Sequence, residues 1–371
     1  MSANGAPRGV IARAVRAISA WRVAARSDVV IKTDGAGWFV DDYAGHIART
    51  LHGRLRIGIV DHLAPWLRRR VVHVADGGCF FNARWIASTH PSHHVIGTWW
   101  HGGPDSIAPG LREAAARLER VGQRLARVHV TCEMSRDVVR KAGVPEEEIV
   151  LLPSGVDATR FYPPTDAQRD EARRRLGVPS GAKVVGLFQK DGDGWDEGFA
   201  PKLVKGPDIF VAVMASLAQR HPVYALVPGP ARGFVLRGLI EAGIPHRNDG
   251  HVPMADLARY YHACDLYIVP GREEGGPAAV LESLATATPL VSHRVGMAPD
   301  LIDDGRNGYL ADVGDIETLA AKADRVLRDG AIRERFRTEG FRTARAFFWP
   351  AMASRYEALY TSVLRARRPT S

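Results

Sequence analysis

Two glutamates flank a glycine turn in residues 271–282, whose sequence is Gly-Arg-Glu-Glu-Gly-Gly-Pro-Ala-Ala-Val-Leu-Glu. Glu274 falls in the turn, and Glu282 falls inside the helix that we expect to follow it. Backbone N–H groups at a helix start bind anions, and glycines let a ligand come close to them. The residues expected to form this anion site are Gly275, Gly276 and Pro277. Because a carboxylate on each side can accept hydrogen bonds from hydroxyls, the stretch predicts a site for an anion between two hydroxyl-bearing rings.

A buried strand is expected directly before this turn, over residues 264–270. Its sequence, Cys-Asp-Leu-Tyr-Ile-Val-Pro, is short and apolar with β-branched and aromatic residues, which is typical of a strand covered on both faces. In open parallel sheets, ligands bind outside the carboxyl ends of the strands. A sugar nucleotide fits this position, with its sugar near Glu274 and its ribose near Glu282. The alternative is an ordinary strand-turn-helix unit whose glutamates are solvated.

The stretch resembles the Glu-x7-Glu element of retaining GT-B glycosyltransferases of the family 4, or group 1, type. The resemblance extends over about residues 28–365 and is strongest from 150 to 310. It implies an α/β fold of two Rossmann-like domains facing a central cleft, with a C-terminal helix that crosses back to the N-terminal domain. It also implies that Glu274 positions the donor sugar as a catalytic residue and that Glu282 binds the ribose.

Basic residues precede this stretch in positions that match the family pattern. Residues 183–190 are expected to form a strand that ends on Lys190, and Lys205 stands before a glycine. They resemble the family's basic residue and Lys-Gly element, whose two cations hold the donor diphosphate. Lys190 replaces the usual Arg. Arg232, in the glycine turn 228–233, departs from the pattern and is either a third phosphate-binding cation or an ordinary surface arginine.

A glycine loop and a histidine are the candidate site residues of the N-terminal half. Gly35 and Gly37 follow an expected strand at 28–32, where GT-B N-terminal domains carry a glycine loop; a plain tight turn is the alternative. His101 follows an expected strand at 95–98, where relatives often carry a histidine next to the reacting sugar. The resemblance therefore implies donor contacts for the two glycines and a catalytic role for His101.

Strand-like and helical stretches alternate along the chain, which favours parallel α/β sheets. Residues 151–163 resemble the family's Pro-Asn-Gly-Val-Asp…Phe-x-Pro linker, with Ser154 in place of the usual Asn. We expect a basic amphipathic N-terminal segment, an N-terminal acceptor-side domain with the C-terminal helix, and a C-terminal donor domain. Their ranges are residues 1–26, residues 27–165 with 350–371, and residues 166–349.

The composition describes a soluble globular protein with an anionic partner. Its 371 residues are 46% hydrophobic and 25% charged, with a net charge of +9. Phosphate, nucleic acid and membrane surfaces all fit this charge. Three separated cysteines indicate neither a disulfide framework nor a zinc site, and no apolar run reaches the roughly 20 residues of a membrane span. The expected location is the cytoplasm, with association at the inner face of a membrane as a further prediction.

Residues 1–26 place arginines opposite apolar side chains when they are projected as a helix. This pattern is typical of a helix that lies on a membrane surface. A packing helix and a frayed basic tail are the alternatives. Membrane contact through this segment is one partner prediction; the others are a nucleotide-diphosphate sugar and a glycan, lipid-linked or small-molecule acceptor, without nucleic acid.

The resemblance implies transfer with retention of anomeric configuration, without a metal or a cofactor, because the cations stabilise the leaving diphosphate. A front-face mechanism, in which the leaving phosphate takes the acceptor's proton, is the family's expectation. Asp191-Gly192-Asp193 mimics a metal-binding Asp-x-Asp motif, but such aspartates are common in exposed turns. A dehydrogenase would need a third glycine after Gly35 and Gly37. A GT-B epimerase or phosphorylase and a non-catalytic basic protein that binds anions or membranes remain the alternatives.

Overall fold

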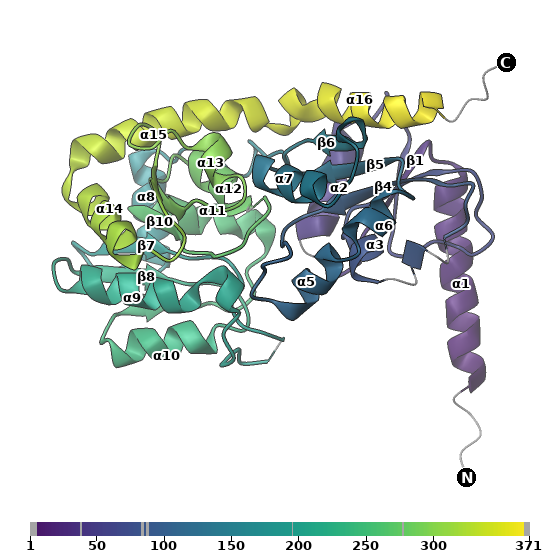
Figure 1. The fold of residues 1–371 in the computed structure, drawn as a ribbon. Coiled ribbons are helices and arrows are strands. Elements are labelled where there is room, and N and C mark those ends of the chain that lie inside the picture. The colour runs from purple at the N-terminus through teal and green to yellow at the C-terminus, as the bar shows by residue number, and fades with distance from the viewer. Residues whose placement is uncertain are drawn as a thin grey trace, which may run out of the picture. The chain divides into compact units, whose positions relative to one another are not determined.

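The computed structural model of the protein describes residues 6–37, 39–82, 85–86, 89–194, 196–276 and 278–366, with side chains from residue 15 onward. The chain forms two compact units (Figure 1). The first contains Met1–Thr131, Ser135–Pro153 and Trp349–Ser371, and the second contains Cys132–Met134 and Ser154–Phe348. The main change of unit therefore falls at residues 153–154, before the boundary at residue 165 that we predicted from the sequence.

The first unit is built on a six-stranded sheet in which all recorded strand pairs are parallel. In spatial order its strands are β2 (Ile57–Val60), β1 (Val29–Lys32), β3 (Val71–Val74), β4 (His94–Trp99), β5 (Arg127–Val130) and β6 (Ile149–Leu151). Its helices are α1 (Ala6–Ala25), α2 (Phe39–Thr50), α3 (Gly78–Phe81), α5 (Pro109–Ala115), α6 (Leu118–Gly122), α7 (Glu133–Lys141) and α16 (Trp349–Ala366), although the first two residues of α7 group with the second unit. β3 is buried along its whole length, as expected for a strand with helices on both sides.

A buried polar chain ties the C-terminal helix α16 to this sheet. The Tyr360 hydroxyl lies 2.8 Å from Nδ1 of His73, whose Nε2 lies 2.8 Å from Oγ1 of Thr98. The same Thr98 oxygen lies 3.1 Å from Nδ1 of His129, and Nε2 of His129 lies 2.7 Å from the Leu152 carbonyl. Burial lowers the pKa of His129 to about 4 and that of His73 well below its ordinary value. Both rings are therefore neutral near pH 7, which makes the chain a structural element of the first unit.

The second unit repeats the architecture with another six-stranded parallel sheet. Its spatial order is β12 (Tyr309–Ala311), β11 (Leu290–His293), β10 (Leu266–Val269), β7 (Lys183–Gly186), β8 (Val223–Leu226) and β9 (His246–Arg247). Its helices are α8 (Asp166–Arg175), α9 (Pro207–Ala218), α10 (Gly233–Glu241), α11 (Met254–Ala263), α12 (Ala278–Ala285), α13 (Ala298–Leu301), α14 (Ile316–Arg328) and α15 (Gly330–Ala344). Apolar side chains from β7, β8, β10, α9 and α14 form its main core.

Each sheet reverses its strand order at one place. In the first sheet the reversal lies between β1 and β3, and in the second it lies between β7 and β10. Loops that leave two such strands diverge, so a ligand fits outside their carboxyl ends. In the second unit, the loops at this position contain Gln189, Lys190 and Glu274.

The two parallel α/β sheets confirm the predicted fold class of two Rossmann-like units. One strand prediction was wrong in its length: β7 ends at Gly186, so Lys190 lies in the loop beyond it. The apolar pattern continues through Leu187 and Phe188 because these side chains pack on core clusters after the strand hydrogen bonding has ended.

Candidate active site

The glycine turn after β10 is in close backbone contact with the Lys-Gly turn before α9. Gly206 has a φ of 67°, and a Cβ atom added there would lie 2.1 Å from the Pro270 carbonyl oxygen. The carbonyl of Val204 accepts hydrogen bonds from the N–H groups of Arg272 at 2.8 Å and Glu273 at 3.1 Å. Only glycine permits this approach of the two backbones, which explains why a glycine follows the lysine.

An ion pair between Arg272 and Asp208 also joins these two turns. The guanidinium of Arg272 donates to both carboxylate oxygens of Asp208, at 2.8 Å and 2.6 Å. Asp208 lies in the first turn of α9, so the pair joins the start of this helix to the β10 turn. Two parallel N–H···O bonds fix the relative orientation of both groups, which rigidifies the turn that carries Glu274.

Glu274 and Lys205 lie in direct contact within this framework. The Nζ atom of Lys205 lies 2.6 Å from Oε2 of Glu274, and Nε2 of Gln189 donates to Oε1 at 2.8 Å. Glu274 is buried, with 8% of its surface exposed. Each carboxylate oxygen has one described partner and can accept a second hydrogen bond. The geometry therefore fixes the carboxylate in one orientation and leaves it able to bind hydroxyl groups.

Two further lysines lie near this pair. Burial lowers the pKa of Lys202, and the positive charges of Lys205 and Lys190 lower it further, while Glu274 acts in the opposite direction. Each of these groups therefore lies close enough to influence the Lys202 ammonium. Lys202 was not among the site residues predicted from the sequence. We define the lysine cluster as Lys190, Lys202 and Lys205, which concentrates positive charge beside one buried carboxylate.

Glu282 lies on α12 and contacts α11. The hydroxyl of Tyr261 donates to Oε2 of Glu282 at 2.8 Å, and both side chains are buried. Gly275 and Gly276 lie in the turn between β10 and α12. Pro277 lies outside the described residues, so its predicted place at the helix start stays a prediction.

Arg232 does not lie on the surface of this site. Only 2% of it is exposed, and its guanidinium donates to the carbonyls of Leu187, at 2.7 Å, and Gln189. It also forms an ion pair with Asp191 at 3.2 Å. Burial raises the pKa of Asp191 to about 6, although the charge of Arg232 acts against this shift. Both readings from the sequence, a phosphate-binding cation and a surface arginine, are therefore corrected: Arg232 positions the backbone that carries Gln189.

A hairpin built from the loop after β7 encloses this ion pair. Gly192 bridges to Pro201, and the N–H of Lys202 donates to the Asp191 carbonyl at 2.7 Å. Gly198 has a φ of 75°, and a Cβ atom added there would lie 2.2 Å from the Ala231 carbonyl. The Asp-Gly-Asp sequence is thus part of a packed hairpin, with its first aspartate buried against Arg232.

We expect Arg232→Met to destabilise the protein by about 3 kcal/mol, because removal of one partner leaves the other charge of a buried pair uncompensated. The matched double variant Arg232→Met with Asp191→Asn removes both charges and should regain most of this loss. Urea unfolding of the three proteins measures the difference. Equal stability of Arg232→Met and the unsubstituted protein would contradict the structural role of Arg232.

In the first unit, Gly35 and Gly37 follow β1 and His101 follows β4, and β3 lies between these two strands in the sheet. Gly35 and Gly37 have φ angles of 67° and 74°, in the left-handed region that favours glycine. The loop ends at Phe39, whose ring contacts Trp100 at a centroid distance of 5.5 Å. Because His101 directly follows Trp100, the glycine loop and the histidine lie at the same edge of the sheet.

The same edge contains an ion pair that the sequence analysis missed. Lys32, at the end of β1, pairs with Asp76, which follows β3. Asp76 also accepts a hydrogen bond from the N–H of Gly78 at 3.0 Å. The sequence contained a signal for this pair. Lys32 ends β1 and Asp76 lies just after β3, and these are the two strands between which the strand order reverses.

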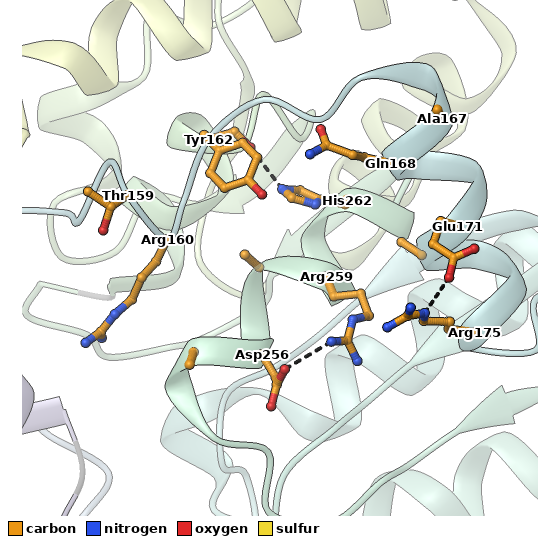
Figure 2. Close-up of a pocket in the computed structure, with 13 residues that line it drawn as sticks. Thr159, Arg160, Tyr162, Ala167, Gln168, Glu171, Arg175, Asp256, Arg259 and His262 are labelled. Atoms are coloured by element: carbon orange, nitrogen blue, oxygen red, sulfur yellow. Dashed lines mark hydrogen bonds and ion pairs between the residues drawn. The ribbon is translucent and has the colours of Figure 1, made fainter.

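A cavity of about 440 Å³ lies elsewhere in the second unit, between the 159–162 segment, α8 and α11 (Figure 2). Figure 2 shows Arg259 directed at Asp256 and Arg175 directed at Glu171, and these pairs are joined at 3.0 Å and 2.5 Å. None of the predicted site residues lines this cavity. We therefore place the candidate active site at the lysine cluster and the two glutamates.

Other expectations concern metals, thiols and membranes. Among the residues that the structure describes, no three His, Cys, Asp or Glu side chains are grouped so that they could hold a metal ion. The three cysteines are buried thiols. Within the described ranges, no helix is long and apolar enough to cross a membrane.

Comparison with known proteins identifies the type of domain. Residues 201–343 match the family described as glycosyl transferases group 1. The D-inositol 3-phosphate glycosyltransferase of Thermomonospora curvata is 31% identical over 251 residues, which cover 62% of this chain and 55% of that protein. The enzyme of that name from Corynebacterium efficiens is 29% identical over 247 residues, which cover 64% of this chain and 56% of that protein. The chain therefore spans little more than half the length of these relatives.

Solved structures show the same fold. Anabaena HepE, solved in complex with UDP and glucose, matches with a TM-score of 0.71 at 16% identity, over 91% of this chain and 100% of that one. The sucrose-phosphate synthase of Thermosynechococcus elongatus matches with a TM-score of 0.65 at 19% identity, over 80% and 74%. These matches and the family match confirm the predicted GT-B fold and the resemblance to group 1 glycosyltransferases.

Proposed function

We propose, from the premise that residues 201–343 form a group 1 glycosyltransferase domain in a GT-B fold, that the protein moves a sugar from a nucleotide diphosphate to an acceptor. The observation that carries this proposal is the contact of Lys205 and Gln189 with Glu274. It joins a cation suited to a diphosphate to a carboxylate suited to sugar hydroxyls, at the carboxyl end of a parallel sheet. HepE, whose fold is similar, was solved in complex with UDP-glucose, which supports a nucleotide-sugar donor.

The proposed chemistry is retaining and independent of metal ions. The lysine cluster and the start of α12 stabilise the negative charge that develops on the leaving diphosphate. Glu274 accepts hydrogen bonds from the donor sugar and orients its ring, which contributes by positioning. In the front-face mechanism, the leaving phosphate oxygen takes the proton of the acceptor hydroxyl while that hydroxyl bonds to the anomeric carbon. Glu282 binds the ribose, and His101 assists at the reacting sugar.

A ligand panel tests whether the protein binds a nucleotide sugar. The folded protein is heated with UDP-, GDP-, ADP- or dTDP-linked sugars, and its Tm is measured. Binding at 100 times Kd stabilises the folded state by about 2.7 kcal/mol. For a unit of this size, we expect one nucleotide class to raise Tm by roughly 5–10 °C. An unchanged Tm with all four classes would defeat the proposal.

Two alternatives predict different products from the same donor. A GT-B epimerase would convert the bound donor to its epimer without an acceptor, whereas a transferase releases the nucleoside diphosphate and glycosylates the acceptor. A protein that only binds anions would leave the donor unchanged. Chromatography of the donor after incubation with glycan, lipid-linked and small-molecule acceptors, including D-inositol 3-phosphate, separates these outcomes.

We also propose that the protein is cytoplasmic and contacts the inner face of a membrane through residues 1–26. Arg22 in α1 and Arg26 directly after it are exposed. The apolar side chains of Val15, Ile18 and Trp21 in α1 are exposed as well. Arginines attract anionic lipid headgroups, and tryptophan favours the boundary between headgroups and acyl chains. This composition supports contact with a membrane surface.

A further inference from the structure

The apolar side chains on α1 are exposed although the helix packs against the first unit. Val15, Ile18 and Trp21 are 61%, 43% and 41% exposed. They follow one another at intervals of three residues, so they lie along one side of the helix. Exposed apolar side chains that are grouped together and rimmed by polar residues mark protein or membrane interaction sites.

The packing of α1 uses a different side of the helix. Ala20 and Ala24 are buried, and they join a small cluster with Val60, Ala64 and Leu67. Small side chains let the helix lie close to β2 and to the segment that follows it. Because the two alanines make this contact, Val15, Ile18 and Trp21 remain exposed. In Figure 1, α1 extends beyond the rest of the first unit toward the N-terminus.

The segment over residues 61–70, which contacts α1, exposes a second tryptophan. Trp66 is 48% exposed, and it lies in a tight turn in which the N–H of Leu67 donates to the Ala64 carbonyl at 3.0 Å. The guanidinium of Arg68 donates to the Pro65 carbonyl at 2.7 Å. The turn therefore holds Trp66 outward while its neighbours Ala64 and Leu67 are buried.

Charge and hydrogen bonding join this turn to α1. The guanidinium of Arg70 donates to the Ala24 carbonyl at 3.2 Å, near the end of the helix. Arg68 and Arg69 are exposed beside Trp66. The acidic group of this segment, Asp61, already pairs with Arg16 of α1. The local charge is therefore strongly positive around both exposed tryptophans.

We infer that α1 and the 61–70 turn form one surface that binds anionic lipid membranes. We name it the tryptophan–arginine surface, and it consists of Val15, Ile18, Trp21, Arg22, Arg26, Trp66, Arg68 and Arg69. The inference rests on the membrane contact proposed for residues 1–26 and adds a second segment to it. The Arg70–Ala24 hydrogen bond and the shared apolar cluster hold the turn against the helix. In this inference the two exposed tryptophans enter the lipid interface and the arginines bind the headgroups.

Vesicle binding of the full chain tests the inference. Sedimentation is measured with vesicles of phosphatidylcholine alone and with vesicles that contain 30% phosphatidylglycerol. We expect the unsubstituted protein to bind the anionic vesicles at least tenfold more tightly. The turn variant Trp66→Ser with Arg69→Gln and the helix variant Trp21→Ser with Arg22→Gln should each weaken this binding about tenfold.

A matched control removes one exposed aliphatic residue and one exposed arginine elsewhere. Ile240→Ser with Arg124→Gln meets this condition and should bind anionic vesicles like the unsubstituted protein. Circular dichroism and Tm establish that each variant is folded. If only the helix variant loses binding, the inference about the turn is overturned and the contact through residues 1–26 stands.

Other results overturn both statements. Absence of binding to both vesicle types would remove the membrane contact itself, and equal binding to neutral and anionic vesicles would remove the recognition of anionic lipid. Displacement of the protein from anionic vesicles by low concentrations of random-sequence duplex DNA, with tighter binding to the DNA, would assign the surface to nucleic acid. Neither result affects the nucleotide-sugar site, because that site is measured separately through the Tm of the protein with its donor.

Discussion

Lys205→Ala is expected to lower kcat/KM for sugar transfer by on the order of 10³, which corresponds to about 4 kcal/mol of lost transition-state stabilisation. The substitution removes the cation that lies 2.6 Å from Glu274 and that we assign to the leaving diphosphate. Charge on the diphosphate increases as the glycosidic bond breaks, so the loss should appear in kcat as well as in nucleotide affinity. Release of the nucleoside diphosphate measures turnover, and the Tm shift with the nucleotide measures binding.

Lys183→Ala is the matched control for this variant. Lys183 begins β7, at the opposite end of the strand from the site, and it is half-buried like Lys205. It should leave turnover within about twofold of the unsubstituted enzyme, since a surface substitution away from the site perturbs little. A folded Lys205→Ala protein with full activity would remove Lys205 from the mechanism.

The contact between Lys205 and Glu274 shows what could be predicted from the sequence. The two residues lie 69 positions apart, but each belongs to a turn near the carboxyl end of a parallel strand. Because these ends share one edge of the sheet, local patterns were sufficient to bring both turns to one place. Their direct ion pair was not predictable, because it depends on a close backbone approach that only a glycine permits: a Cβ atom added at Gly206 would lie 2.1 Å from the Pro270 carbonyl oxygen.

Arg232 shows where local reasoning fails. An arginine beside a glycine turn has the same local pattern whether it faces a phosphate or the interior. Its burial depends on the ion pair with Asp191, a residue 41 positions earlier in the chain that the hairpin holds in contact with it. The same limit applies to Gln189 and Tyr261, whose hydrogen bonds to the two glutamates depend on tertiary packing. The strands, in contrast, were predictable because their apolar runs are buried on both faces.

Glu274→Ala is expected to reduce transfer by on the order of 10³ while nucleotide binding changes little, because the carboxylate contacts the sugar part of the proposed donor. The Tm shift with the nucleoside diphosphate alone should therefore persist, and the rate of transfer should fall. Glu274→Gln retains the shape and one acceptor oxygen but loses the charge that holds Lys205, so we expect an intermediate rate.

Glu282→Gln provides the opposite pattern and makes the Glu274 prediction specific. Glu282 lies on α12, hydrogen-bonded to Tyr261, and is assigned to the ribose. Its substitution should weaken the binding of the nucleoside diphosphate itself and so raise KM for the donor. It should leave kcat at saturating donor nearly unchanged. The two glutamates are thus separated by which parameter each one changes. If Glu274→Ala turned over at the unsubstituted rate, or if both variants lost nucleotide binding equally, the division of the site into a sugar end and a ribose end would be wrong.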